Sequence, residues 1–205
     1  MHNIAVCVSG GGTNLQAILD ASREGLLPNG KVALVVSDRE SAGALGRAEA
    51  AGVPNMVIPK KRQSEITGAF RDFFIDYVVL SGYLSILPGA VIETYRNKII
   101  NIHPALCPAF SGMGFYGLKV HEAVLDSGVK ITGATVHFAD EGVDTGAILM
   151  QRAVPVRRSD TPETLRDRVL QTEHALIVEA VAALTDGRVA FDGGKAWITD
   201  KRSGE

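Results

Sequence analysis

Two polar side chains that can move protons or stabilise charge stand at the end of an apolar stretch. Residues 99–104 read Ile-Ile-Asn-Ile-His-Pro, and Pro104 ends a strand because it has no backbone N–H to donate. Alternate side chains of a strand share a face, so we expect Asn101 and His103 side by side. An amide can donate to a developing oxyanion, and an imidazole can exchange a proton near neutral pH. The alternative is that both only satisfy loop backbone groups.

A carboxylate for the same cluster is predicted in the loop Asp-Glu-Gly-Val-Asp-Thr-Gly at residues 140–146. Asp144 beside an imidazole would fix its tautomer and stabilise its protonated form. Asp144 could equally cap its own turn. The sequence contains no Gly-x-Ser-x-Gly motif and no evident activated cysteine, so a covalent nucleophile is not expected. The residues suit direct attack by a bound amine on a carbonyl.

A glycine-rich loop near the start of the chain is the candidate anion site. An apolar run at residues 4–8 is followed by Ser-Gly-Gly-Gly-Thr-Asn, and helical spacing begins at Leu15. Free backbone N–H groups at the start of a helix bind phosphate, and the Thr13 hydroxyl adds a donor. Leu15 stands where the third glycine of the dinucleotide motif would be, so that motif is not present. A tight turn that needs glycine only for its geometry is the alternative, and phosphate binding is favoured over it.

Strands and helices alternate along most of the chain, which predicts an α/β fold with a single doubly wound, mostly parallel sheet and helices on both faces. A long loop at 104–117 follows His103, and a hairpin is expected near the end. We interpret residues 1–205 as one domain. The expected strands are residues 4–8, 32–37, 53–58, 77–80, 99–103, 133–138 and 147–156. The expected helices are a helix that begins at residue 15 and the segments 42–51, 62–74, 88–95, 118–125 and 161–184. The expected hairpin pairs residues 189–191 with residues 196–198.

Composition excludes several classes of partner. A formal net charge of −2 gives no broad field for nucleic acid or an anionic membrane. The two cysteines form neither a disulfide framework nor a metal-binding pattern, and we expect Cys7 and Cys107 to be packing residues. The chain starts without a signal-peptide pattern and has no apolar run long enough to span a bilayer, so we predict a cytoplasmic protein. The sequence leaves the oligomeric state open, a homodimer included.

Four segments together resemble the phosphoribosylglycinamide formyltransferases. These segments are Ser-Gly-Gly-Gly-Thr-Asn-Leu-Gln-Ala at 9–17, Asn-Ile-His-Pro-Ala-Leu-Cys-Pro at 101–108, Gly-Ala-Thr-Val-His-Phe at 133–138 and Asp-Thr-Gly at 144–146. The resemblance runs from Asn3 to about Trp197. The Asn-x-His-Pro motif is shared by folate-dependent formyltransferases generally, and the other segments narrow the resemblance to this family.

The resemblance implies a Rossmann-like formyltransferase fold that transfers the formyl group of 10-formyltetrahydrofolate to glycinamide ribonucleotide, without a metal. Residues up to about 100 would form the ribonucleotide-phosphate-binding half, and residues from about 101 the catalytic and folate-binding half. The implied catalytic residues are Asn101, His103 and Asp144. The implied ribonucleotide-binding residues are Gly11, Gly12, Thr13, Asn14 and Glu173. The implied folate-binding residues are Arg62, Leu84, Ser85, Ile86, Leu87, Asn101, Asp140, Glu141 and Val143.

Some features depart from the family pattern or keep other activities open. Ser85 stands where the family commonly has Arg, the segment 59–76 is shorter than expected, and Ala105 and Cys107 replace the usual Ser and Leu. His137 is expected to support the site, and His121 and His174 to be structural or surface residues. The alternatives are formyl transfer to methionyl-tRNA, hydrolysis of 10-formyltetrahydrofolate, and a silent folate or phosphoribosyl sensor. We expect an enzyme that formylates methionyl-tRNA to carry a basic carboxyl-terminal domain, and an enzyme that hydrolyses 10-formyltetrahydrofolate to carry an amino-terminal regulatory domain.

Overall fold

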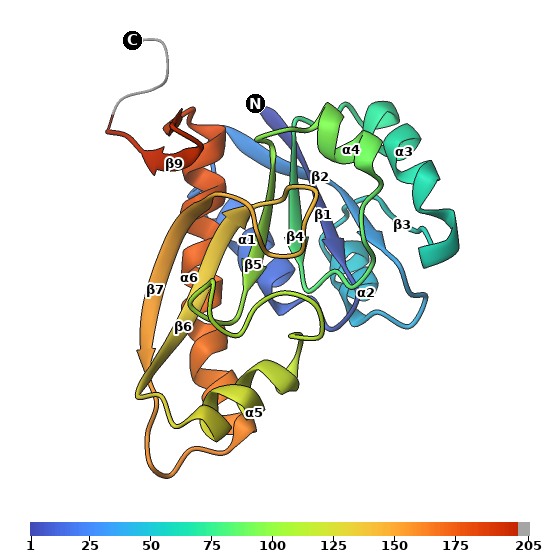
Figure 1. The fold of residues 1–205 in the computed structure, drawn as a ribbon. Coiled ribbons are helices and arrows are strands. Elements are labelled where there is room, and N and C mark those ends of the chain that lie inside the picture. Colours follow the sequence, from blue (N-terminus) through green and yellow to red (C-terminus); the bar gives the residue numbers. More distant parts are fainter. Residues whose placement is uncertain (201–205) are drawn as a thin grey trace.

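A seven-stranded sheet forms the centre of the protein, which we describe for residues 1–200 from a computed structural model (Figure 1). The strand order is β3-β2-β1-β4-β5-β6-β7, with β1 to β5 parallel and β6 and β7 antiparallel to their neighbours. The predicted mostly parallel α/β sheet is therefore confirmed. The strands are β1 (His2–Val8), β2 (Gly30–Ser37), β3 (Asn55–Val57), β4 (Tyr77–Ser81), β5 (Ile99–His103), β6 (Ile131–Phe138) and β7 (Ile148–Pro155).

Helices cover both faces of the sheet, as the alternating sequence predicts. The apolar faces of α1, α2 and α6 pack with α5 in one core, and those of α3 and α4 pack in the other. One apolar stripe of α6 is fully buried and consists of Leu165, Val169, Leu176 and Ala180. The helices are α1 (Thr13–Arg23), α2 (Gly43–Ala50), α3 (Ile66–Asp72), α4 (Gly89–Thr94), α5 (Leu118–Ser127) and α6 (Pro162–Thr185), and a hairpin of β8 (Val189–Asp192) and β9 (Lys195–Ile198) follows them.

The register of the parallel strands brings the candidate motifs to one edge. Val8 of β1 lies opposite Ser81 of β4, and Ser81 lies opposite Ile102 of β5. Neighbouring strands are about 4.8 Å apart, so the loops after β1 and β5 begin only about 10 Å from each other. The carboxyl edge of such a sheet is where α/β proteins bind ligands. The fold therefore brings the glycine loop close to the Asn-x-His motif.

Two predicted elements differ from the structure. The strand expected at 53–58 is only the three residues of β3, consistent with Pro54 at its start. The helix expected from Arg62 begins at Ile66, because residues 60–65 form a 3-10 helix with a non-helical backbone at Arg62. The side chain of Gln63 is buried and donates to the Ile58 carbonyl, which holds this tight turn in place. No helix within residues 1–200 is long and apolar enough to cross a membrane.

A partly buried ion pair fixes the connection that leads from β7 into α6. Arg168 contacts both carboxylate oxygens of Asp160, at 2.5 and 2.8 Å, and also donates to the Pro155 carbonyl at 2.9 Å. The Asp160 side chain is 2% exposed. Its hydrogen bonds with Arg168 lower the pKa of Asp160 to about 2 from 3.8. The pair therefore contributes stability that is complete above about pH 4 and is lost as the pH falls through about 2.

We expect Asp160→Asn to lower the free energy of unfolding at pH 7 by about 1–3 kcal/mol, because it leaves the Arg168 guanidinium without its charged partner. Urea unfolding at several pH values should show this deficit shrinking below pH 4. Asp167→Asn is the matched control, since Asp167 forms an exposed pair with Arg166 and should cost less than about 0.5 kcal/mol. A deficit for Asp160→Asn that does not change with pH would contradict the interpretation.

Candidate active site

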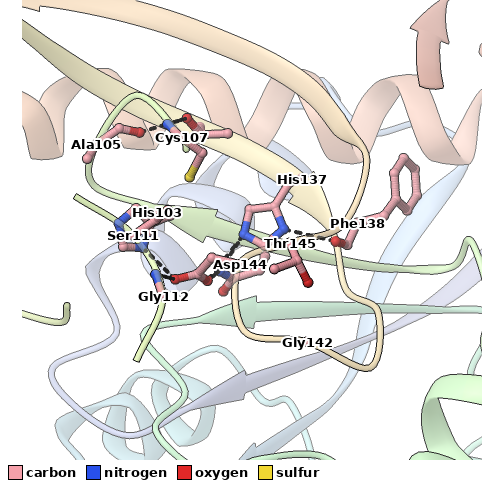
Figure 2. Close-up of polar contacts among 12 residues, drawn as sticks. His103, Ala105, Cys107, Ser111, Gly112, His137, Phe138, Gly142, Asp144 and Thr145 are labelled. Atoms are coloured by element: carbon pink, nitrogen blue, oxygen red, sulfur yellow. Dashed lines mark hydrogen bonds and ion pairs between the residues drawn. The ribbon is translucent and has the colours of Figure 1, made fainter. Parts of the chain in front are cut away.

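Asp144 is the centre of a polar cluster formed by β5, β6 and two loops (Figure 2). Its Oδ1 accepts from Asn101 Nδ2 at 3.2 Å, and its Oδ2 accepts from the Gly112 N–H at 2.9 Å. His103 Nδ1 lies 3.5 Å from Oδ2, and His137 Nε2 lies 3.4 Å from Oδ1. The predicted Asn101, His103 and Asp144 therefore meet. They are joined by His137, which the sequence indicated only as a supporting residue.

Strand pairing explains why His137 belongs to this cluster. Asn101 of β5 lies directly opposite His137 of antiparallel β6, and Asn101 Nδ2 is 3.0 Å from His137 Nε2. His137 Nδ1 is 2.9 Å from the Phe138 carbonyl, which can only accept, so Nδ1 carries the proton. Nε2 of the neutral ring then accepts from Asn101. One amide group thus donates to both His137 and Asp144.

His103 is held in a definite tautomer by the loop that follows it. Its Nε2 is 2.8 Å from the Phe110 carbonyl, so Nε2 carries the proton and the unprotonated Nδ1 of the neutral ring faces Asp144. Burial lowers the pKa of His103, and this outweighs the Phe110 hydrogen bond and the Asp144 charge, which both raise it. A neutral imidazole with its acceptor nitrogen toward a carboxylate is poised to take up a proton.

The carboxyl group of Asp144 stays ionised despite its burial. Desolvation raises the pKa of Asp144, but its interactions with His137, with the Gly112 N–H and with His103 lower the pKa by more, so the net pKa is below its ordinary value. A hydrogen-bonded, ionised carboxylate beside a neutral imidazole can accept a proton from a bound amine, directly or through water.

Glycines shape the loop that presents Asp144. A Cβ at Gly142 would lie 2.0 Å from Thr145 Oγ1, and one at Gly146 would lie 2.0 Å from the Phe138 carbonyl oxygen. Asp144 itself has a φ of 58°, a left-handed backbone that costs a non-glycine residue roughly 1 kcal/mol or more. The surrounding contacts hold this strained residue in place. Asp144 is therefore held by its neighbours and does not merely cap a turn.

The loop after His103 is anchored to the sheet through Thr135. The Thr135 hydroxyl donates to the Ala105 carbonyl at 2.7 Å and accepts from the Cys107 N–H at 3.0 Å. Gln151 of β7 donates to Thr135 and to the Cys107 carbonyl. This network fixes the path toward Phe110, whose carbonyl orients His103. The Cys107 thiol is buried and burial raises its pKa, consistent with the expected packing role.

The glycine loop leads into α1 as predicted, with free donors at its end. Gly12 has a φ of 72° and precedes the first helical residue, Thr13. A Cβ at Gly12 would lie 2.5 Å from the Cβ of Ala44. Only glycine satisfies both the backbone angle and the close approach to α2. The loop thus places backbone N–H groups of the α1 N-terminus at the carboxyl edge of the sheet, close to the cluster.

Asn14 and Glu173 meet across 159 residues of sequence. Asn14 Nδ2 donates to Glu173 Oε2 at 2.9 Å, and each residue is 7% exposed. Burial raises the pKa of Glu173, and the Asn14 hydrogen bond offsets only part of that effect. Asn14 Oδ1 is buried without a partner within the described residues. Glu173 is thus not a solvated helix charge, and an unpartnered acceptor lies next to a buried carboxyl group.

The residues expected to bind folate lie in different environments. Leu84 and Ile86 are exposed, while Leu87 is part of the core and Ser85 is 6% exposed with its hydroxyl donating to Asp38 at 2.8 Å. Asp140 accepts from Gly142 and Thr145 and so organises the loop itself. The remaining charged and apolar members are Arg62 paired with Glu65, Glu141 paired with Arg96, and Val143 at 38% exposure.

Comparison with known proteins identifies the class to which this fold and site belong. The family model described as Formyl transferase matches residues 2–181. The chain therefore belongs to the formyl transferase family.

Individual relatives place the chain within that family. The phosphoribosylglycinamide formyltransferase of Arabidopsis thaliana, named as chloroplastic, is 42% identical over 98% of this chain and 71% of its own length. The enzyme of that name from Vigna unguiculata is 43% identical over 92% of this chain, which spans 62% of its length. The crystal structure of glycinamide ribonucleotide transformylase 1 from Symbiobacterium toebii has a TM-score of 0.91 and 41% identity, with 98% of this chain and 95% of that chain covered. This protein is thus a member of the phosphoribosylglycinamide formyltransferases.

We expect Gly12→Ala to lower the free energy of unfolding by about 1–3 kcal/mol, because the new Cβ meets Ala44 and the positive φ disfavours any side chain. Gly10→Ala is the matched control in the same loop, since its Cβ would meet nothing within 4 Å and its φ is not positive. That control should change stability by less than about 0.5 kcal/mol. Guanidinium unfolding measures both, and equal effects would show that Gly12 is not conformationally required.

Proposed function

We propose that the cluster around Asp144 carries out formyl transfer from 10-formyltetrahydrofolate to the amine of glycinamide ribonucleotide. The relatives' names supply the acceptor, and formyl transferase membership supplies the reaction class. The observation that carries the proposal is that Asp144 lies within 3.5 Å of Asn101, His103 and His137 at the carboxyl edge of the sheet. This set provides a proton acceptor, a proton carrier and an amide donor.

The proposed reaction begins when the substrate amine attacks the formyl carbon and forms a new C–N bond. The carbonyl oxygen becomes an oxyanion and the nitrogen becomes positive, so the nitrogen must lose a proton. Asp144 accepts that proton, directly or through water, and Nδ1 of His103 can receive it because that atom faces the carboxylate. When the intermediate collapses, the bond between the carbon and N10 of the folate breaks, and N10 takes the proton.

Asn101 is proposed to stabilise the oxyanion, but it must first release one of its present hydrogen-bond partners. Both amide hydrogens of Asn101 are used in the free protein, one by His137 and one by Asp144. To donate to the formyl oxygen, Asn101 exchanges one of these partners. Protonation of Asp144 favours that exchange, because the neutral carboxyl group is a weaker acceptor than the carboxylate. Proton transfer and oxyanion stabilisation are therefore coupled in this proposal.

The glycine loop and Glu173 are proposed to hold the ribonucleotide, with its phosphate at residues 11–14 and its glycinamide part near Glu173. The folate is proposed to lie against exposed Leu84 and Ile86 and the loop at 140–144. Arg62, Ser85, Leu87, Asp140, Glu141 and Val143 remain proposed folate neighbours. We also propose that residues up to about 100 form the ribonucleotide-phosphate-binding half and residues from about 101 the catalytic and folate-binding half. The proposed partners are the two small-molecule substrates, and the proposed location is the cytoplasm. Among residues 1–200 no group of three or more His, Cys, Asp or Glu is placed to hold a metal ion.

We expect His103→Ala to reduce kcat by about 10²–10⁴-fold while changing the Kd for glycinamide ribonucleotide by less than about threefold, because His103 acts on the proton and not on the ribonucleotide. A formyl-transfer assay and calorimetric titration measure the two effects. His2→Ala is the matched control, since His2 lies at the start of β1 and contacts Asp76. Near-normal turnover in His103→Ala would remove His103 from the mechanism.

Glu173→Gln should separate stability from binding. The pKa of Glu173 is raised in the folded protein, so its ionisation weakens folding increasingly as the pH rises above its ordinary value of 4.5. We expect the variant to melt at a higher temperature than the wild type at pH 8, with a KM for glycinamide ribonucleotide raised about tenfold. Glu179→Gln, in an exposed pair with Arg152 on the same helix, is the control. An unchanged KM would exclude Glu173 from ribonucleotide binding.

A further inference from the structure

Helix α2 grips the glycine loop through the loop's own carbonyl groups. The Ala44 N–H donates to the Gly10 carbonyl at 3.2 Å, and Arg47 Nε donates to the Gly11 carbonyl at 2.7 Å. A Cβ added to Gly43 would lie 3.6 Å from Gly11 Cα, so the first turn of α2 packs directly on the loop. Two consecutive peptide groups of the loop are therefore oriented by α2.

These hydrogen bonds from α2 determine the direction of the backbone N–H groups of the loop. In a trans peptide the carbonyl and the N–H point in opposite directions. Because the Gly10 and Gly11 carbonyls face α2, the N–H groups of Gly11 and Gly12 face away from it. Neither N–H has a hydrogen-bond partner within the described residues. Two aligned, unpaired backbone donors are a typical anion-binding arrangement.

Arg47 is itself held in position and keeps one donor nitrogen free. Its Nη1 donates to Gln16 Oε1 at 3.0 Å, and Gln16 Nε2 donates to Asp20 Oδ1 at 3.0 Å. Nη2 has no partner in the part of the chain that the structure describes. Burial and then the charge of Arg47 lower the pKa of His174, which follows Glu173 on α6. A second indication of a ligand beside the loop is the buried, unpartnered Oδ1 of Asn14, an acceptor that would bond a donor group of the ribonucleotide and not its phosphate.

We propose that Arg47 is the positioning residue of the phosphate site: it binds the Gly11 carbonyl, turns the Gly12 N–H toward the ribonucleotide phosphate, and places a fixed positive charge behind the loop. This inference rests on the proposed function of the loop. It also explains how a protein with a net charge of −2 binds an anion, since the attraction is local and comes from one guanidinium and backbone donors.

The test uses the full-length enzyme, with inorganic phosphate as a competitive inhibitor against glycinamide ribonucleotide. Arg47→Met keeps the length of the side chain and removes its charge and donors. We expect it to raise both the KM for the ribonucleotide and the Ki for phosphate about tenfold, with kcat and the KM for the folate within about twofold of wild type. Arg47→Lys keeps the charge without the fork of donors and should recover part of the loss.

Arg71→Met is the control for loss of a surface charge, because Arg71 is 83% exposed on α3. A Ki for phosphate within twofold of wild type in Arg47→Met would overturn the role of Arg47, even if the variant is less stable. If Arg47→Met does not fold, Arg47→Lys provides the test. An Arg47→Lys enzyme whose KM for the ribonucleotide, kcat and Ki for phosphate all equal those of the wild type would overturn the role of Arg47. If phosphate does not compete with the ribonucleotide in the wild type, the glycine loop is not the phosphate site, and the positioning role of Arg47 is then wrong as well.

Discussion

A single carboxylate, that of Asp144, must stay ionised while it is largely withdrawn from water, and the rest of the site is arranged around that requirement. Burial raises the pKa of Asp144. The hydrogen bonds from the Gly112 N–H and the Asn101 amide stabilise the carboxylate, and interactions with the two imidazoles also lower its pKa. These groups come from β5, from β6 and from the loop after β5. Because they come from separate segments, the sheet register and the loop path together set the environment of this carboxylate.

The antiparallel pairing of β6 with β5 is what makes this environment possible. The long connection after β5, which includes α5, returns the chain so that β6 runs antiparallel beside β5 and sets His137 opposite Asn101. The loop that follows β6 then turns back over the end of β5, and glycines at 142 and 146 let it do so without steric conflict. Asp144 adopts its left-handed backbone at this turn. The strain is local, and the hydrogen bonds of Asp144 with Asn101 and Gly112 hold the residue in this conformation.

The parallel half of the sheet has a different task in the proposed function, which is to place the proposed phosphate site near the cluster around Asp144. The loops after β1 and β4 are joined where the Ser9 hydroxyl accepts from the Leu84 N–H and the Ser9 N–H donates to the Gly82 carbonyl. This connection links the glycine loop to the segment proposed for the folate. Two substrates that must react with each other are thus assigned to adjacent loops of one rigid edge, and binding both of them supplies the proximity that a bimolecular transfer needs.

Amino-acid spacing by itself determined the alternation of strands and helices, the glycine loop, the shared face of Asn101 and His103, and the apolar stripe of α6. Each of these depends on neighbours within one or two turns of helix or along one strand, so local periodicity records them. The loop composition had already indicated Asp144, and the resemblance to a family added Glu173 to the candidate site. The 3-10 turn at Arg62 was not predicted, because it is set by Gln63 reaching Ile58 and Tyr83.

Only the tertiary structure decided which partners these residues have. His137 joins the cluster through its register with Asn101, Ser85 is turned toward Asp38, and Arg47 reaches the Gly11 carbonyl from a helix 36 residues away. None of these contacts leaves a periodic trace in the sequence, because they depend on strand order and on the packing of α2 against the loop. Hydrogen bonds select their partners by distance and direction, and distant segments acquire both only when the sheet has assembled.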